Sequence, residues 1–215
     1  TTMEALLIRH LYGRPLDTLL ATLGVSVALQ QAARDIFGAP NVQVTAPAWL
    51  RGGVEVFGLY LPMSRLFILA LAAVAVASVY WYLYRTGAGR RIRATMQNRA
   101  VAESQGIDTR RVDAVTFALG GGLAGLAGCA LTLLGPIGPA LGTYHIVDAF
   151  MVVVLGGLGQ LAGTAVAALA IGSAGAMFEL GMGTSLAKAA VFALVILFLQ
   201  FRPSGIIAVR SRAID

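Results

Sequence analysis

The stretch Ala114–Val147, AVTFALGGGLAGLAGCALTLLGPIGPALGTYHIV, contains no Asp, Glu, Lys or Arg. The same is true of Ala149–Phe178, AFMVVVLGGLGQLAGTAVAALAIGSAGAMF, which follows the single residue Asp148, and of Leu66–Tyr84. A helix needs about 20 mostly apolar residues to cross the hydrocarbon core of a bilayer. The first two stretches are each long enough for more than one crossing, so they predict a chain that is embedded in a lipid membrane.

The composition excludes a water-soluble domain. Apolar residues make up 58% of the 215 residues and charged residues only 12%, whereas soluble domains carry about 25% charged residues. The net charge of +6 does not indicate nucleic-acid binding here, because an excess of Arg in a membrane protein marks its cytoplasmic loops. A lipid membrane is therefore the predicted surrounding, and nucleic acid is not a predicted partner.

We predict an all-α, polytopic membrane protein with about six transmembrane or partly re-entrant helices. The fourth and fifth segments share the uncharged stretch after Asp148, and the glycines near residues 156–160 separate them. The fourth is short, so we expect it to be tilted, short or discontinuous. The other four segments are about Leu16–Ala33, Ser64–Tyr84, Ala114–Leu134 and Thr184–Phe201.

The distribution of basic residues predicts the orientation of these helices. If the N-terminus is cytoplasmic, the inner segments carry twelve Arg, whereas the outer segments carry three Arg and Lys188. Basic residues concentrate in cytoplasmic loops. We therefore expect both chain ends on the cytoplasmic side, which also requires an even number of crossings.

Two loops have distinct character. The outer loop, about Asp35–Arg65, contains Pro40, Pro47, Pro62 and a Gly pair, which predicts turns and short extended pieces. In the inner loop, Thr95–Gln105 contains good helix formers without Pro or Gly, and Gly106 stands where a helix would end. We expect a short helix there along the cytoplasmic surface.

Small residues recur at a spacing of four in the third segment. Gly121 and Gly125 are four apart, as are Ala124 and Gly128. This spacing lets helix backbones approach closely in lipid. Packing within the chain is one interpretation, and a face that lines a subunit interface or a transport pathway is the other.

The run Gly157-Leu158-Gly159-Gln160-Leu161-Ala162 matches the G-x-G-x-x-G/A dinucleotide fingerprint. That fingerprint needs a soluble unit of parallel strands and helices, whereas both flanks here continue as uncharged runs of membrane length. A membrane-anchored oxidoreductase is therefore disfavoured. We expect Gly156, Gly157 and Gly159 to form a tight turn or a helix break between two spans.

Asp148 stands alone between uncharged runs. Two interpretations remain open: it caps an outer helix start, or it lies on a transport pathway, because carboxylates inside membranes are costly and often functional. We expect Glu179 and Lys188 to flank helix ends beside water. No phosphate-binding loop, metal-ligand spacing or nucleophile–base set is present, so we predict no catalytic residue, metal or cofactor.

Three stretches of the inner loop carry a family resemblance: Arg90-Arg91-Ile92-Arg93-Ala94, Asn98-Arg99-Ala100 and Gly106–Val112. Together they resemble the coupling loop of ABC importer permeases of the branched-chain amino acid (LivH-like) family. Residues 116–128 and 148–159 resemble that family's following spans. The urea-transporter branch is the one most resembled by Tyr12–Thr22, residues 30–34 and residues 37–42. The general E-A-A-x-x-x-G motif of importer permeases is degenerate here, since only Ala102 and Gly106 agree with it.

The resemblance implies one transmembrane permease domain over residues 1–215, with a cytoplasmic coupling loop at 85–112. It also implies that N-terminal spans of the family precede Thr1, and that the bacterial inner membrane holds the chain. The implied partners are a second permease subunit, cytoplasmic ABC ATPase subunits and a periplasmic substrate-binding protein. The residues expected to form the coupling element are Asn98, Arg99, Ala102, Glu103, Gly106 and Ile107.

The resemblance implies a transport subunit without enzymatic activity of its own, because ATP would be hydrolysed on the partner. Urea or a short amide is the substrate that the branch resemblance implies, and a branched-chain amino acid is the alternative. A stand-alone secondary transporter or channel is the rival class. It would need functional polar groups at mid-span, where this sequence offers mainly Gly, Ser, Thr and Gln.

Overall fold

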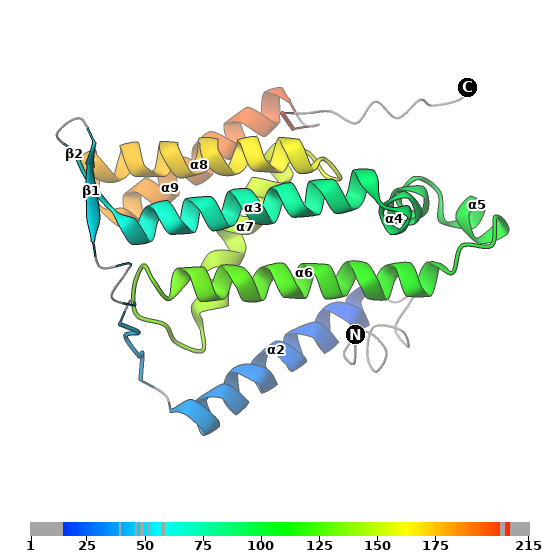
Figure 1. Cartoon of the computed structure of the whole chain (residues 1–215), viewed down its shortest axis with the longest axis horizontal. Helices are drawn as coiled ribbons and strands as arrows, with labels where there is room; N and C mark the ends of the chain where they lie inside the picture. Colours follow the sequence, from blue (N-terminus) through cyan, green and yellow to red (C-terminus); the bar gives the residue numbers. More distant parts are fainter. Residues whose placement is uncertain are drawn as a thin grey trace. The chain divides into compact units, whose positions relative to one another are not determined.

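The computed structural model describes residues 15–38, 40–45, 47, 50, 52–56, 59–202 and 205–206. The chain divides into two compact units, Thr1–Leu141 and Gly142–Asp215, and each is described by itself. The elements of the first unit are α2 (Pro15–Phe37), β1 (Gly53–Val56), β2 (Leu59–Pro62), α3 (Met63–Arg85), α4 (Gly87–Gln97), α5 (Arg99–Ser104) and α6 (Thr109–Leu131) (Figure 1). Those of the second are α7 (Leu141–Gly156), α8 (Leu161–Gly181) and α9 (Thr184–Phe201).

The all-α membrane fold predicted from the sequence is confirmed. Among the described helices, α3, α6, α8 and α9 are long and apolar enough to cross a membrane. They correspond to the second, third, fifth and sixth predicted segments. The first segment is the 23-residue helix α2, which carries Asp17, Gln30 and Arg34 among its apolar residues. The fourth is the shorter helix α7.

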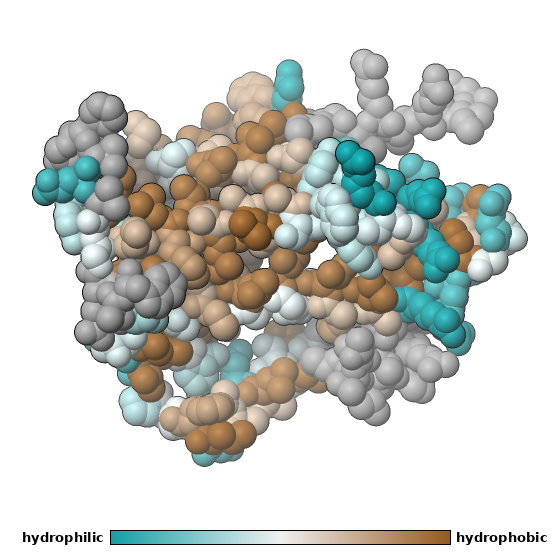
Figure 2. All heavy atoms as spheres, in the orientation of Figure 1, coloured by the Kyte–Doolittle hydropathy of each residue, from teal (hydrophilic) through white to brown (hydrophobic). Residues whose placement is uncertain are grey.

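The surfaces of α3 and α6 are largely exposed and apolar. Leu69 and Val74 of α3 are 59% and 63% exposed, and no residue of α3 is buried. Figure 2 shows hydrophobic residues over α3 and α6, whereas hydrophilic residues gather over α4 and α5. Apolar side chains at this exposure are stable only in an apolar solvent.

A sharp corner joins α3 to α4. The Thr86 hydroxyl donates to the Tyr82 carbonyl (2.6 Å) and accepts from the Gly89 amide (3.1 Å), so it ends one helix and caps the next. Gly89 and Ile92 are buried in the corner, while Arg90 and Arg91 stay exposed. The α4 helix is therefore amphipathic, with one apolar side and one strongly basic side.

The predicted turns and extended pieces of the loop 35–65 are present. β1 and β2 form an antiparallel hairpin in which Gly53 pairs with Pro62 and Val56 with Leu59. Val42 exchanges backbone hydrogen bonds with Ile137 (2.9 and 3.0 Å), which ties this loop to the segment after α6. Arg51 of this loop lies outside the described residues.

The second unit has a small apolar core between its helices. Met151 and Leu155 of α7, Ala167 of α8, and Val191 and Val195 of α9 form this core and are nearly inaccessible. The chain returns to it after α9, where the Ile206 amide donates to the Leu155 carbonyl (2.8 Å). This hydrogen bond satisfies one of the carbonyls that the end of a helix leaves without a partner.

The dinucleotide fingerprint is contradicted, and the predicted turn is confirmed. The residues before it belong to α7, so the strand that the fingerprint requires is a helix here. Gly157 (φ +94°) and Gly159 (φ +85°) adopt the left-handed conformation that favours glycine, and they reverse the chain between α7 and α8.

The predicted capping position of Asp148 is wrong. The predicted topology put Asp148 at the start of an outer helix, where it could cap that helix. Instead α7 begins at Leu141, so Asp148 lies in the middle of the helix and cannot cap its start. Only the pathway interpretation of Asp148 stays open.

The chain ends lie outside the described residues. They contain four of the twelve Arg on which the predicted orientation depends, namely Arg9, Arg14, Arg210 and Arg212. The start of the resemblance to the urea branch, Tyr12-Gly13-Arg14, also lies there.

Candidate functional site

The predicted helix over Thr95–Gln105 is interrupted at Asn98. The Asn98 backbone is extended (φ −156°, ψ 109°), and its side chain accepts a hydrogen bond from the Val101 amide (3.2 Å). Asn is neutral or unfavourable inside helices but strongly favoured at the first cap, where its oxygen satisfies a free amide. The result is two helices, α4 and the six-residue α5, in place of the single helix that we expected.

The predicted end of this helix at Gly106 is confirmed. Gly106 has φ +79°, and its amide donates to the Glu103 carbonyl (3.0 Å). The Ile107 amide then donates to the Ala102 carbonyl (3.1 Å). This left-handed glycine closes α5, as is common at helix ends. Ala102 is 3% exposed, so it anchors the inner face of α5.

Arg99 links α5 to the start of α6. Its Nε lies 3.3 Å from Oε1 of Glu103, the pair four residues apart that the sequence predicted to share a face. Its Nη2 lies 2.9 Å from Oδ2 of Asp113 and donates to the Thr109 hydroxyl (3.1 Å). One guanidinium group therefore contacts side chains of two helices, a geometry that its rigid fork of donors permits.

Thr109 is the buried member of a network that also contains Arg99, Glu103 and Asp113. It is 4% exposed, and its hydroxyl donates to Oε1 of Glu103 (2.6 Å). This hydrogen bond lowers the pKa of Glu103, and Arg99 acts in the same direction. A carboxylate whose pKa is lowered by folding stabilises the fold above its ordinary titration range and loses that contribution only as the pH falls through the lower value. The Glu103 carboxylate is therefore charged at neutral pH.

Sequence reasoning missed Thr109 and Asp113 as members of this site. Both belong to the first turns of α6, and the turn at residues 105–108 brings them beside Arg99. The one available signal was Asp108, which caps α6 by accepting from the Arg111 amide (3.2 Å) and so sets where the helix begins. From that start, Thr109 and Asp113 fall four apart on one face.

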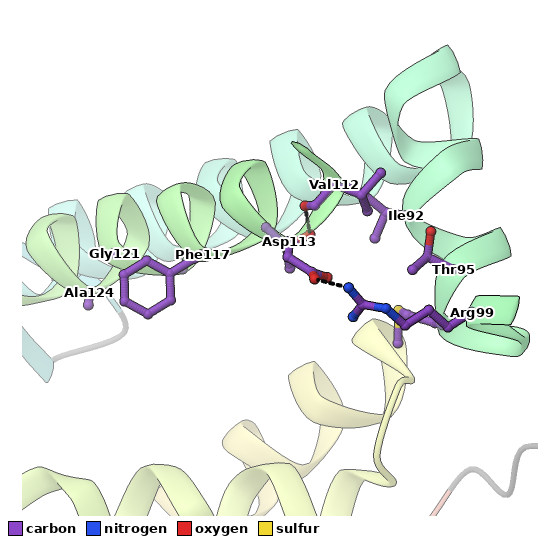
Figure 3. Close-up of a pocket in the computed structure, with 11 residues that line it drawn as sticks. Ile92, Thr95, Arg99, Val112, Asp113, Phe117, Gly121 and Ala124 are labelled. Carbon is purple, nitrogen blue, oxygen red and sulfur yellow. Dashed lines mark hydrogen bonds and ion pairs between the residues drawn. The ribbon is translucent and has the colours of Figure 1, made fainter. Parts of the chain in front are cut away.

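A cavity of about 720 Å³ runs from this network along α6. Figure 3 shows Arg99 and Asp113 joined at one end, and Phe117, Gly121 and Ala124 following along α6. Ile92 and Thr95 of α4 line its other side. Apart from its charged end, the lining is mostly apolar, with Thr95 and Thr116 as its other polar side chains. The network therefore lies where a mostly apolar helix surface meets a polar region.

Among the described residues, no atom lies close to the positions where three glycines of α6 would carry a side chain. A Cβ atom added at Gly121, Gly125 or Gly128 would meet nothing within 4 Å. Both interpretations of this face therefore stay open, packing within the chain and a face that lines a subunit interface or a transport pathway. Gly156, in contrast, packs tightly against the backbone of Gly163 and Thr164 in α8.

Removing the Asn98 cap is expected to loosen α5. Asn98→Ala deletes the oxygen that accepts from the Val101 amide, and losing such a helix cap costs about 0.5–2 kcal/mol. We expect faster amide hydrogen exchange over residues 99–104 in the detergent-solubilised protein. Ser104→Ala is the control, since the Ser104 hydroxyl donates only to the Val101 carbonyl within α5. Unchanged exchange in Asn98→Ala would show that the cap does not hold α5.

Comparison with known proteins identifies the family. Residues 5–200 match the family described as branched-chain amino acid transport system / permease component. The chain belongs to this family. No solved structure matches the chain significantly.

Among curated relatives, the permease protein LivH of the high-affinity branched-chain amino acid transport system from Salmonella typhimurium is 30% identical over 196 residues, 89% of this chain and 64% of the relative. BraD from Pseudomonas aeruginosa is 27% identical over 201 residues, 91% of this chain and 65% of the relative. The ribose import permease RbsC from Haemophilus influenzae is 35% identical over 105 residues, 45% of this chain and 32% of the relative. The chain thus spans less than two thirds of the length of the relatives that it matches.

Proposed function

We propose that this chain is the permease subunit of an ATP-driven importer in the bacterial inner membrane. The observation that carries the proposal is the match of residues 5–200 to a permease family. The four long apolar helices support it, because they supply membrane spans. ATP would be hydrolysed on separate ABC ATPase subunits. A second permease subunit and a periplasmic substrate-binding protein would complete the complex.

In this proposal α5 is the coupling helix that meets the ATPase. Together with the residues that flank α5, the coupling element would comprise Asn98, Arg99, Ala102, Glu103, Gly106 and Ile107. Two observations support a mechanical role. α5 has a defined start and end at Asn98 and Gly106, and Arg99 ties it to α6 through Asp113 and Thr109. A displacement of α5 by the ATPase would therefore move the inner end of a membrane span.

The proposed orientation places residues 85–112 and both chain ends in the cytoplasm, and the β1–β2 hairpin outside. The bias of Arg toward the inner segments supports it. The α6 glycine face, Gly121, Gly125 and Gly128, is then available to the second permease subunit or to the pathway, since nothing within 4 Å would meet a side chain there.

For the substrate we propose a branched-chain amino acid. The relatives LivH and BraD, whose printed names give that cargo, cover about nine tenths of this chain, and they support this choice. Urea or a short amide is the alternative substrate, because the first part of the chain resembles the urea-transporter branch. Two relatives named for ribose align with 45% and 54% of the chain, a smaller share than LivH and BraD.

The test is uptake by the reconstituted complex. The chain is co-purified with the ATPase, second permease and binding-protein products of neighbouring genes and placed in proteoliposomes. Uptake of labelled leucine, urea and ribose is then compared with ATP and with a non-hydrolysable ATP analogue. We expect ATP-dependent accumulation of leucine and no accumulation with the analogue.

Each other result changes the proposal in a defined way. Accumulation of urea alone would replace the substrate and keep the ATP-driven mechanism. Leucine uptake by the permease without ATPase subunits would show a secondary transporter or a channel. Absence of any ATP-dependent uptake would overturn the importer itself.

A further inference from the structure

The second unit contains a cavity whose lining combines charges of both signs with an aliphatic surface. The cavity has a volume of about 390 Å³ and lies between α7, α8 and α9. Small-molecule sites in proteins occupy about 300–1,000 Å³ and combine apolar walls with a few polar groups. The apolar wall includes Met151, Val152, Ile171 and Val191, and the charged groups are Asp148, Glu179 and Lys188.

The charged groups come from three different helices. Lys188 of α9 is the only lysine in the sequence, and its Nζ lies 3.5 Å from Oδ2 of Asp148 in α7. His145 Nδ1 lies 3.7 Å from the same oxygen. Glu179 of α8 lines the same cavity, and its carboxylate makes no ion pair with any described residue. The cavity thus holds one ammonium group and two carboxylates.

These charges remain accessible to a ligand. Charge-assisted N–H···O bonds are usually about 2.7–2.9 Å long, so the 3.5 Å contact between Lys188 and Asp148 is loose. Their side chains are 57% and 36% exposed. A charge at the middle of a membrane-spanning helix costs about 2.5–3.5 kcal/mol, and such charges mostly line cavities or pathways. Asp148 lies in the middle of α7, whereas Lys188 and Glu179 lie near the ends of α9 and α8. A loose, open ion pair does little to recover that cost by itself.

We propose, building on the importer function above, that this cavity binds a zwitterionic α-amino acid with an aliphatic side chain. The carboxylate of the ligand would pair with Lys188, and its ammonium group with Glu179 and Asp148. Its side chain would lie against Met151, Ile171 and Val191. A neutral ligand such as urea or ribose gains little from separated opposite charges, so the cavity also favours an amino acid as the cargo.

The test measures binding separately from transport. Equilibrium binding of labelled leucine is measured on the whole complex in nanodiscs without the binding protein, for wild type, Lys188→Met and Glu179→Gln. Losing one charge-assisted bond should raise the Kd of leucine about tenfold or more. Isoamylamine and 4-methylpentanoate, which lack the carboxylate and the amine respectively, should compete at least about tenfold less well than leucine.

A double variant separates binding from folding. Asp148→Asn with Lys188→Met removes both charges of the pair, so neither is left uncompensated, and it should fold while still binding leucine weakly. Lys188→Arg should retain most of the binding. Ser173→Ala, on α8 outside the cavity lining, is the matched control and should bind like wild type.

The outcomes distinguish the site from the importer. A wild-type complex that imports leucine while Lys188→Met and Glu179→Gln bind it like wild type overturns the site and leaves the importer standing. Wild-type binding by the double variant would make the pair purely structural and also overturn the site. A wild-type complex that imports urea but no leucine overturns the proposed cargo, and the site with it.

Discussion

Replacement of Arg99 by Gln is expected to uncouple ATP hydrolysis from import while the permease stays folded in the membrane. Arg99 is the group that contacts Glu103 on α5 and both Thr109 and Asp113 on α6. Gln cannot span these partners, so a push on α5 would no longer reach α6 through them. Coupling free energies of about 1–3 kcal/mol correspond to factors of about 5–150. We therefore expect the ratio of leucine imported to ATP hydrolysed to fall by about tenfold.

Two further variants make this prediction specific. Asp113→Asn should also lower the ratio of leucine imported to ATP hydrolysed, although Asp113 belongs to α6 and not to the proposed coupling helix α5. Arg111→Gln is the matched control, because the Arg111 side chain is 88% exposed and pairs only with its neighbour Asp108 among the described ion pairs. Exposed pairs of this kind contribute little. If Arg99→Gln and Arg111→Gln behaved alike, the network would have no part in coupling.

Gly156→Ala is expected to prevent the second unit from folding correctly. A Cβ atom at Gly156 would lie 2.5 Å from the Thr164 N and Cα atoms and 2.7 Å from the Gly163 carbonyl carbon. These are backbone atoms at the start of α8, so they cannot move away by a change of rotamer as a side chain could. Overpacking costs about 1–3 kcal/mol or more, a large share of the stability of a domain. We expect loss of the monodisperse peak in detergent size-exclusion chromatography and a lower unfolding temperature.

Gly24→Ala is the control for this experiment. Gly24 lies within α2, and an added Cβ would meet nothing within 4 Å there. Ala is favoured over Gly in a helix interior by about 0.5–1 kcal/mol, so this variant should elute like wild type and unfold at the same or a higher temperature. A Gly156→Ala protein with wild-type stability would show that α7 and α8 can separate without consequence.

The spans could be predicted from the sequence because one physical requirement dominates them. Uncharged runs such as Ala114–Val147 have no stable place outside lipid, and the helices α3, α6, α8 and α9 follow from that alone. The helix starts could not be predicted as well. The start of α7 at Leu141 falls inside an uncharged run, where neither a cap residue nor a charge marks it.

The site was only partly predictable, and Asn98 shows why. Its neighbours are good helix formers, so their summed propensity favours one continuous helix. The side chain of Asn98 competes locally by capping the amide of Val101, and this local bond decides the break. The pairing of Arg99 with Glu103 follows from helical spacing, whereas its pairing with Asp113 depends on how the turn at 105–108 folds back.

Because Lys188 is exposed, chemical labelling of the unsubstituted chain can show on which side of the membrane this residue lies. Within these 215 residues an amine-reactive label has one lysine side chain to react with, Lys188, and that side chain is 57% exposed. A membrane-impermeant label added to intact cells would modify Lys188 if α9 begins at the outer surface. The same label added to everted vesicles would modify it if α9 begins inside. Protection of Lys188 by leucine would report on the occupied cavity in the same experiment.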